Sequence, residues 1–438
     1  MQLPAAYLNR MQTQLGGDFA AYLRAMEQPP RRALRVNTLK ISPAAFQSLC
    51  DFPLEPSGLL PESFLFSEDI PIGRHPLHAA GLAYVQEASA AVPASLLQVQ
   101  PGEKVLDLCA APGGKSGQLA AALQGSGILI ANEPVAARAN ILQYNLERLG
   151  VTNAVVTCAF PEQLALALPG YFDAVLVDAP CSGEGMFRKE PSAITDWSPE
   201  NVVACARRQQ DILASADRLL RPGGRMVYST CTFSAEEDEL AVAAFCDAHP
   251  AYVCRKQQHY YPHTCAGEGQ FAAVLKKRED APVASAPARR AAPQKKRPIQ
   301  KEANPPALAM EFFKTYCTVQ PSGTPALLAD GRVVLLPENL PSLTGIRVLR
   351  AGLLAGTVRG SRFEPDHALF LGLGAAAFRQ NVCVAGAQAT RFLAGETLPC
   401  DALLAGWCAV CWNGYPLGFG KAVQGTLKNH LPKGLRIL

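Results

Sequence analysis

Strand-like and helical segments alternate through the middle of the chain, and this alternation restricts the possible folds more than any other feature. Strands are predicted at 104–109, 127–133, 154–158, 172–178, 225–231 and 271–275. Helical patterns lie between most of them, after Lys115, at 135–149, near 199–220 and at 235–247. Such a series predicts an α/β fold with a doubly wound, mostly parallel sheet. Ligands of these sheets bind beyond the carboxyl ends of the strands.

The chain has 438 residues, which exceeds what one hydrophobic core usually serves, so two or three domains are expected. We assign residues 1–90 to an N-terminal α+β module with a basic segment, and residues 91–276 to the doubly wound domain. Residues 308–438 have short strands and turns, which predicts a β-rich domain. Residues 277–307 form a basic, Ala/Pro-rich linker, either a solvated tether or a non-specific contact for phosphate groups.

Composition indicates a globular chain, with 49% hydrophobic and 18% charged residues. No apolar run reaches membrane-spanning length and no secretory signal is apparent, so we expect a cytoplasmic protein without a membrane partner. The fourteen cysteines are therefore expected to be reduced thiols. The pair Cys408 and Cys411 has no second pair or nearby histidine, so no metal site is predicted. The net charge of +4 permits a nucleic-acid partner.

A glycine turn follows the first strand of the doubly wound domain. Residues 105–116 read Val-Leu-Asp-Leu-Cys-Ala-Ala-Pro-Gly-Gly-Lys-Ser and pass from a buried strand into a helix. Paired glycines let the backbone approach a ligand, and the helix start offers free N–H groups to a carboxylate. Glu133 ends the next strand, where a carboxylate can accept both hydroxyls of a ribose. The alternative for Glu133 is an exposed acid that caps a helix.

Two thiols follow the next pair of strands. Asp178-Ala-Pro-Cys181 ends one strand and Ser-Thr-Cys231 ends the other, so both thiols are expected near one pocket. An isolated cysteine is usually a small buried apolar residue. Here the Ser and Thr neighbours and the strand-end positions favour a reactive role.

Six motifs spread over nearly the whole chain resemble one family. They are the segments at 35–38 (Arg-Val-Asn-Thr), 84–89 (Tyr-Val-Gln-Glu-Ala-Ser), 107–116, 178–181, 229–232 and 267–271 (Gly-Glu-Gly-Gln-Phe). Together they resemble the RsmB/RsmF-type RNA cytosine-5 methyltransferases, whose eukaryotic relatives are the Nop/Sun proteins. The segments at 412–421 and 428–434 are similar to the PUA-like domain of the RsmF branch, which acts on 16S ribosomal RNA.

The resemblance implies a Rossmann-like methyltransferase sheet that binds S-adenosyl-L-methionine, with an RNA-binding N-terminal module and a PUA-like RNA-binding domain. The expected partner is RNA, foremost 16S rRNA or the small ribosomal subunit, and the expected state is a monomer. The implied cofactor-binding residues are Cys109, Ala110, Ala111, Pro112, Gly113, Gly114, Lys115, Glu133 and Asp178.

The resemblance also implies that residues 186–189 and Trp197 line the RNA side. The alternative for Arg188 and Lys189 is a solvated charge pair. Phe160 stands where many relatives carry an acid near the adenine, and its ring is expected to stack or pack there instead.

Cytosine carbon 5 is a poor nucleophile, and a thiolate that adds at carbon 6 makes it electron-rich. A base must then remove the proton from carbon 5 so that the thiol can leave. The resemblance implies that Cys231 is the nucleophile and Cys181 assists release, while Asp178 hydrogen-bonds the pyrimidine edge. The target base has to leave its stack, so single-stranded or opened RNA is expected.

Alternatives of two kinds stay open. One keeps the chemistry and changes the substrate to transfer RNA. The other is a ribosome-assembly factor that binds RNA and cofactor without catalysis, although the intact Cys181 and Cys231 argue against it. Methylation of an exocyclic amine is disfavoured, because Asp178-Ala-Pro-Cys181 replaces the Asp/Asn-Pro-Pro-aromatic motif of those enzymes.

Overall fold

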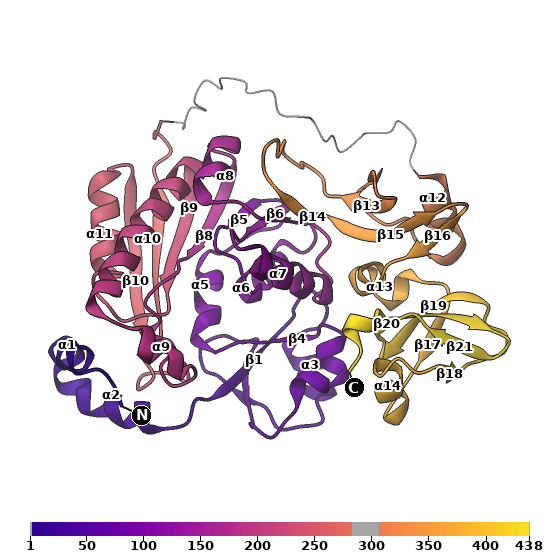
Figure 1. Ribbon diagram of the computed structural model, residues 1–438, viewed down its shortest axis with the longest axis horizontal. Helices are drawn as coiled ribbons and strands as arrows, with labels where there is room; N and C mark the ends of the chain where they lie inside the picture. The colour runs from indigo at the N-terminus through magenta and orange to yellow at the C-terminus, as the bar shows by residue number, and fades with distance from the viewer. Residues whose placement is uncertain (1, 283–305, 438) are drawn as a thin grey trace.

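The computed structural model describes residues 2–282 and 306–437, and an eight-stranded sheet lies at its centre (Figure 1). Five neighbouring strands of this sheet are parallel, and antiparallel strands extend it at both ends. In spatial order the strands are β10 (Tyr252–Tyr260), β11 (Gln270–Lys277), β9 (Leu220–Thr230), β8 (Phe172–Asp178), β5 (Lys104–Asp107), β6 (Ile128–Asn132), β7 (Ala154–Thr157) and β14 (Val348–Ala351). The predicted α/β, doubly wound sheet is confirmed.

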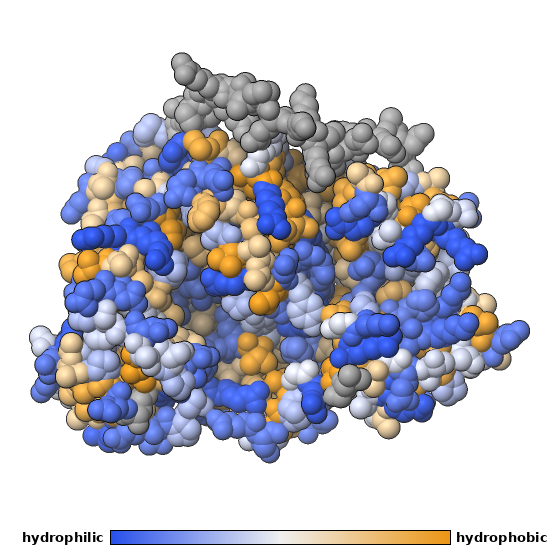
Figure 2. Space-filling view, viewed as in Figure 1, coloured by the Kyte–Doolittle hydropathy of each residue, from blue (hydrophilic) through white to orange (hydrophobic). Residues whose placement is uncertain are grey.

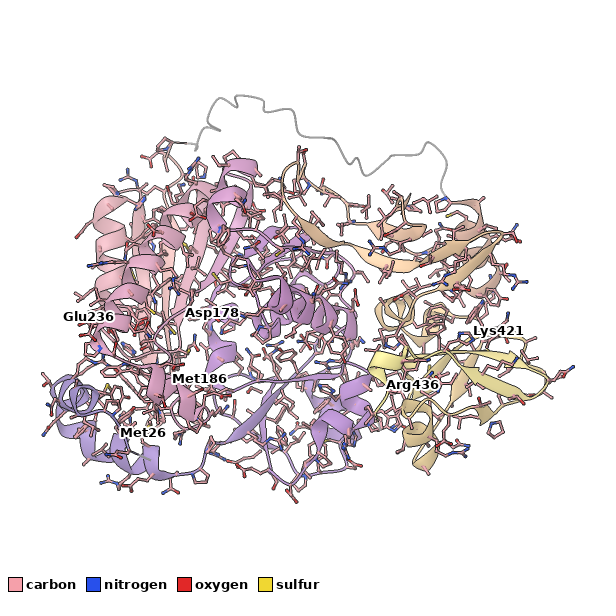
Figure 3. The ribbon with its side chains drawn as sticks, in the orientation of Figure 1. Met26, Asp178, Met186, Glu236, Lys421 and Arg436 are labelled. Carbon is pink, nitrogen blue, oxygen red and sulfur yellow. The ribbon has the colours of Figure 1, made fainter. Side chains whose placement is uncertain are left out.

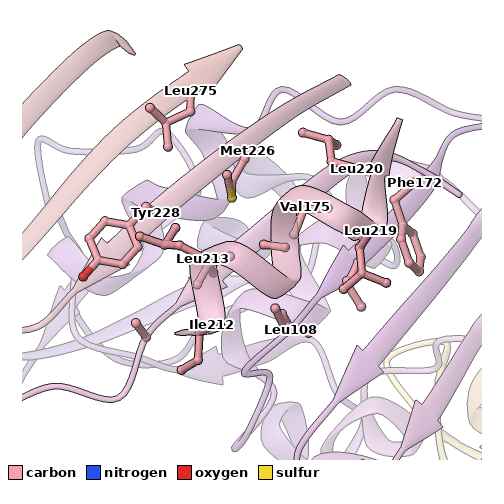
Figure 4. Packing of buried hydrophobic residues seen from close by; sticks show 14 of the residues in the cluster. Leu108, Phe172, Val175, Ile212, Leu213, Leu219, Leu220, Met226, Tyr228 and Leu275 are labelled. Carbon is pink, nitrogen blue, oxygen red and sulfur yellow. The ribbon is translucent and has the colours of Figure 1, made fainter. Parts of the chain in front are cut away.

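Helices cover both faces of this sheet, which explains why its strands are apolar on both sides. In β6, Ile128 and Ile130 pack into one apolar cluster, whereas Leu129 and Ala131 pack into another on the opposite face. Figure 4 shows part of the first cluster, where Ile212, Leu213 and Leu219 of α10 meet strand residues. Helices α8 (Pro161–Ala167), α10 (Pro199–Leu219) and α11 (Glu239–Ala248) cover that face, and α5 (Val92–Leu96), α6 (Gly114–Leu123) and α7 (Ala136–Arg148) cover the other.

The N-terminal segment is an α+β module that reaches the central domain. Helices α1 (Ala5–Leu15) and α2 (Phe19–Glu27) lie to the left of α9 (Pro191–Asp196) in Figure 1. Tyr7 and Tyr22 of these helices share an apolar cluster with Phe187, Trp197 and Phe233. An antiparallel sheet follows, in the order β2 (Glu55–Pro56), β3 (Ser63–Phe66), β1 (Arg32–Val36) and β4 (Ala83–Val85), with α3 (Pro43–Leu49) after β1.

The segment after the linker forms two further sheets beside the central domain (Figure 1). One has the order β12 (Thr324–Leu327), β13 (Arg332–Leu336), β15 (Leu353–Arg359) and β16 (Arg362–Pro365), and α12 (Ala307–Tyr316) packs on it. The other has the order β17 (Asn381–Cys383), β19 (Gly406–Trp412), β20 (Tyr415–Val423), β21 (Thr426–Asn429) and β18 (Leu398–Pro399). Helices α13 (His367–Leu373) and α14 (Ala387–Leu393) accompany them.

The C-terminal segment is in contact with the rest of the chain in several places. Strand β14 pairs with β7 and so completes one end of the central sheet. Phe392 and Leu427 share an apolar cluster with Phe46 and Phe52 of the N-terminal module. The domain limits given above stay predictions. The sequence did not indicate that β14 joins the central sheet.

Most of the predicted linker, residues 283–305, lies outside the described residues, and so does its possible phosphate contact. At its start, Lys277 is instead the last residue of β11, with its Nζ buried 2.8 Å from Asp217 Oδ1. At its end, Ala307 already begins α12.

Hydrophilic side chains cover much of the face seen in Figure 2, with apolar patches between them. Within the described residues, no helix combines the length and the apolar character needed to cross a membrane.

Candidate active site

Three carboxylates gather at the carboxyl ends of neighbouring parallel strands: Asp107 ends β5, Glu133 follows β6 and Asp178 ends β8. Asp107 is buried, and burial raises its pKa to about 7, although its Oδ2 accepts a hydrogen bond from Ser116 Oγ at 2.6 Å. Its Oδ1 is buried and has no hydrogen-bond partner among the described residues. Burial, followed by the charges of these three acids, also raises the pKa of the Cys109 thiol.

Glu133 is buried, and α7 has no side-chain cap, so the alternative of an exposed acid that caps a helix is wrong. Its Oε1 accepts a hydrogen bond from the Val135 backbone N–H at 2.9 Å, just before α7 begins. Its Oε2 lies 3.3 Å from the guanidinium of Arg138, which is half exposed. Glu133 therefore holds the turn that precedes α7 while it stands at the edge of the sheet with Asp107.

The two glycines of the turn serve different purposes. Gly113 has a φ of 112°, a left-handed conformation that favours glycine. Gly114 begins α6, and a Cβ atom there would lie 2.9 Å from Cε1 of Tyr84. Asn145 holds the turn by donating a hydrogen bond to the Pro112 carbonyl at 2.9 Å. The second glycine therefore makes room for the motif at 84–89 rather than for a ligand.

The two predicted thiols meet. Cys181 follows β8 and Cys231 follows β9, and their Sγ atoms are 3.3 Å apart. Both residues are half-buried. The contact with Cys231 and burial raise the pKa of Cys181 well above its ordinary value. Cys181 therefore stays a thiol at neutral pH and can donate its proton toward the sulfur of Cys231.

A partly buried ion pair lies beside the thiols. Lys115 Nζ is 2.8 Å from Asp178 Oδ2, and Asp178 Oδ1 accepts a hydrogen bond from Ser229 Oγ at 2.8 Å. Burial lowers the pKa of Lys115, but Asp178 and then Cys231 outweigh burial and raise it above its ordinary value. Lys115 therefore remains a cation next to the thiol pair, a placement that the sequence did not indicate.

Glu237 connects the loops that carry the two cysteines, and the sequence analysis missed it. Its buried carboxylate accepts hydrogen bonds from the Ser182 backbone N–H at 3.0 Å and from Gln209 Nε2 at 2.9 Å. It also accepts one from Ser182 Oγ, which is itself 2.8 Å from Thr232 Oγ1. Acids are common at helix starts, so the sequence near α11 gave no signal for this role.

A second buried acid, Glu184, ties the same loops to the N-terminal helices. It accepts hydrogen bonds from Trp197 Nε1 at 2.8 Å and from the Phe233 backbone N–H at 3.0 Å. Arg10 of α1 pairs with it at 2.6 Å. Figure 3 shows Met26 of α2 on the same side of the molecule as Asp178, Met186 and Glu236.

Several residues that were expected to line the RNA side are buried instead. Phe187 and Trp197 pack in the cluster with Tyr7 and Tyr22. The side chain of Arg188 is 7% exposed, and its Nε lies 2.7 Å from Glu268 Oε2. The prediction that Phe187, Arg188 and Trp197 face RNA is therefore wrong, as is the alternative of a solvated pair for Arg188. Met186 and Lys189 remain half exposed.

Phe160 and the C-x-x-C pair lie apart from the thiols. Phe160 follows β7 and is 63% exposed, so its role near an adenine stays a prediction. Cys408 and Cys411 belong to β19, and each packs into a different apolar cluster. Because they face opposite sides of one strand, these two thiols do not converge on one ion.

The edge of the sheet fits a cofactor that carries a ribose and an amino-acid group. Asp107 Oδ1 is an unsatisfied buried acceptor, Glu133 stands at the next strand end, and the start of α6 presents N–H groups. These groups lie where ligands of doubly wound sheets bind, beyond the ends of the parallel strands. Fold and site together define a Rossmann-like, S-adenosyl-L-methionine-dependent methyltransferase.

Family models match the chain in four places. "16S rRNA methyltransferase RsmB/F" matches residues 94–281, and "N-terminal domain of 16S rRNA methyltransferase RsmF" matches residues 3–88. "RsmF rRNA methyltransferase first C-terminal domain" matches residues 311–373, and "Methyltransferase RsmF PUA domain" matches residues 380–437. The chain belongs to the RsmF family of methyltransferases.

Two curated relatives are similar to this chain over nearly their full length. Ribosomal RNA small subunit methyltransferase F of Serratia proteamaculans is 33% identical, with 99% of this chain and 96% of the relative covered. The protein of the same name from Vibrio vulnificus is 34% identical, with 99% and 97% covered.

Solved structures are similar to about two thirds of the chain. A methyltransferase homologue from Pyrococcus horikoshii is 27% identical with a TM-score of 0.54, covering 63% of this chain and all of that one. NSun6 from Pyrococcus horikoshii with SFG has a TM-score of 0.55 and 22% identity, covering 63% of this chain and 99% of that one. The second likeness concerns the fold alone.

Proposed function

We propose that this protein methylates carbon 5 of a cytidine in 16S ribosomal RNA. The observation that carries the proposal is the pair of thiols of Cys181 and Cys231, 3.3 Å apart beside the Lys115–Asp178 ion pair. The relatives named ribosomal RNA small subunit methyltransferase F support the substrate, and the match to the PUA domain model supports RNA binding.

In the proposed reaction, the Cys231 thiolate attacks carbon 6 of the cytosine and forms an S–C bond, which makes carbon 5 nucleophilic. The Lys115–Asp178 ion pair and the Cys181 thiol lie beside the Cys231 sulfur, and Cys181 can donate a hydrogen bond to it. Asp178 accepts a hydrogen bond from the pyrimidine edge and so holds the base. S-adenosyl-L-methionine, when bound, supplies an electrophilic methyl group. We assign its binding to Glu133, Asp178 and residues 109–115.

The contact between the sulfur atoms links the protonation of Cys181 to the state of the Cys231 sulfur during the reaction. Its pKa is raised first of all by Cys231. Once the Cys231 sulfur has become a neutral thioether, this cause disappears, so the pKa of Cys181 falls. Cys181 then releases its own proton to solvent, and the resulting Cys181 thiolate takes the proton from carbon 5. The electron pair of that C–H bond restores the C5–C6 double bond and expels Cys231 as a thiolate.

The test uses two cysteine variants and a matched control. With cofactor and RNA, Cys181→Ala is expected to accumulate a covalent protein–RNA adduct that survives a denaturing gel, and Cys231→Ala is expected to form none. Cys205→Ala, a buried cysteine of α10, should behave like the unaltered protein. An adduct that persists in Cys231→Ala would contradict the assignment of the nucleophile.

The substrate is tested in the same preparation. Purified 16S rRNA and transfer RNA are incubated in parallel, and the modified nucleoside is identified by mass spectrometry after digestion. We expect 5-methylcytidine in 16S rRNA. Methylation of transfer RNA alone would contradict the assignment of 16S rRNA as the substrate. Detection of 4-N-methylcytidine would contradict the proposed methylation at carbon 5.

A further inference from the structure

Three side chains of types that bind metals lie close together near the end of β9, the strand that precedes Cys231. Asp238, Glu239 and His259 each offer one ligand atom, and these atoms lie within 4.8 Å of one another. The acids belong to a run that starts at Glu236, which Figure 3 labels. None of the three residues has a role in the reaction proposed above.

The fold brings these residues together from two neighbouring elements, α11 and β10. Asp238 and Glu239 stand at the start of α11. His259 lies on β10 opposite Phe271 of β11, and Phe271 lies opposite Thr230 of β9. Asp238 is fully buried, and the side chain of His259 is 11% exposed.

Each of the three residues has a buried polar atom without a hydrogen-bond partner in the part of the chain that the structure describes. These atoms are Asp238 Oδ2, Glu239 Oε2 and His259 Nδ1. Asp238 Oδ2 and His259 Nδ1 are 3.9 Å apart, which is too far for a hydrogen bond. Buried polar atoms almost always have partners, so three such atoms in one cluster call for an explanation.

We propose that Asp238, Glu239 and His259 bind one divalent metal ion of the Mn²⁺ type. Two carboxylates and one imidazole form a donor set that suits such ions. Metal–ligand bonds of about 2.1 Å place adjacent donors about 3 Å apart and opposite donors about 4.2 Å apart. The unpartnered atoms His259 Nδ1 and Asp238 Oδ2 are 3.9 Å apart, which lies between these two spacings. His259 Nε2 is hydrogen-bonded to Glu239 Oε1 at 2.8 Å, and this contact holds the imidazole in place.

Neighbouring side chains fix the positions of Asp238 and His259, as outer hydrogen bonds and packing do for the ligands of metal sites. Asp238 Oδ1 accepts a hydrogen bond from Thr230 Oγ1 at 2.5 Å. The His259 ring stacks on Tyr261 at 5.0 Å and packs against Phe271 at 4.8 Å. The side chain of Glu239 is 38% exposed and lines an open groove between α11 and β10, which gives an ion access.

The bound ion has a structural role, because its ligand Asp238 contacts Thr230, the residue that precedes Cys231, and not Cys231 itself. It joins the start of α11 and the end of β10 to Thr230, and so restrains the strand end that carries the nucleophile. No proton or methyl transfer passes through it.

The experiment measures Mn²⁺ binding to the full chain after treatment with a chelator. Mn²⁺ is the probe because it prefers carboxylate and imidazole ligands over thiolates, and the chain has fourteen cysteines. Electron paramagnetic resonance titration is expected to show one bound ion per chain, and binding is expected to raise the melting temperature. Asp238→Asn and His259→Gln should each weaken the affinity at least about tenfold.

Two variants on the same helix and the turn after it serve as controls. Asp247→Asn, at an exposed site, and His249→Gln should bind Mn²⁺ like the unaltered protein. Glu239→Gln changes a half-exposed ligand and tests the site even if a buried substitution prevents folding. The absence of saturable one-to-one binding, or equal affinity in all variants, would overturn the proposal. The adduct assay with Cys181→Ala is read separately, so either proposal can fail alone.

Discussion

At the residue scale, the site depends on buried charges whose neighbours set their protonation. Asp107 is the clearest case, because its carboxyl group is fully buried and faces no cation directly. Lys115 shows the opposite balance, since the carboxylate of Asp178 keeps it charged despite burial. Cys181 stays protonated because of Cys231. In each case burial acts against the charged form, and the neighbouring groups decide whether burial prevails.

Asp107 is expected to make the protein less stable as the pH rises from 5 to 7. Burial raises its folded-state pKa to about 7, whereas an unfolded aspartate has a pKa of about 3.9. Between these values the folded state binds more protons, so the free energy of unfolding falls with pH and levels off above about 7. Between pH 5 and 8, the free energy of unfolding of the unaltered protein is expected to fall by about 2–3 kcal/mol more than that of Asp107→Asn.

Urea denaturation of both proteins at pH 5 and pH 8 measures this difference. Gln47→Ala, which removes an exposed side chain of α3 that carries no titratable group, is the control and should follow the unaltered protein. Parallel pH dependence in Asp107→Asn and the unaltered protein would show that Asp107 ionises normally.

At the element scale, the loops after β8 and β9 are locked to each other by backbone contacts. The Gly185 N–H donates a hydrogen bond to the Cys231 carbonyl at 2.9 Å. A Cβ atom at Gly185 would lie 2.8 Å from the Gly269 carbonyl oxygen and 3.0 Å from that of Cys231. The position of the nucleophile therefore depends on a residue without a side chain.

Gly185→Ala is expected to shift the Cys231 backbone and slow methylation about 10- to 100-fold, since small displacements of reacting groups have large effects on rate. Methyl incorporation into RNA from a labelled cofactor measures this. Gly17→Ala is the matched control, because a Cβ atom there meets nothing within 4 Å. An unchanged rate in Gly185→Ala would mean that the loops adjust without moving the nucleophile.

The sequence predicted these elements where burial follows a simple pattern. β6 was found because Ile128 to Ala131 are apolar on both faces. β10 was missed because it is an edge strand whose polar residues, Arg255 to Gln258, are exposed. The thiol pair followed from adjacent strand ends, but Glu184 and Glu237 did not, because acids near turns and helix starts are usually solvated. Trp197 was misjudged because the sequence does not reveal that α1 covers it.

At the scale of the whole molecule, the C-terminal segment belongs to the central sheet as much as to its own domain. β14 covers the edge of β7, and Arg350 of that strand donates hydrogen bonds to the Gly352 and Val151 carbonyls. The N-terminal module also shares an apolar cluster with the C-terminal sheet. The three parts of the chain therefore stabilise one another.

A chain that ends at residue 282 is expected to melt at a lower temperature than the full protein and to self-associate. Truncation exposes the edge of β7 and the apolar side chains of Phe46 and Phe52. Thermal unfolding followed by circular dichroism and sedimentation velocity measure the two effects. A truncated chain that remains monomeric and melts with the full protein would show that the C-terminal contacts contribute little.

The late position of β14 in the chain also bears on synthesis. About seventy residues separate it from β11, so a ribosome making this protein releases seven strands of the sheet before the eighth exists. During that interval the nascent sheet has an open edge to which another nascent chain can pair. Premature termination after β11 would leave this edge permanently open, and such products are natural clients for chaperones and proteases.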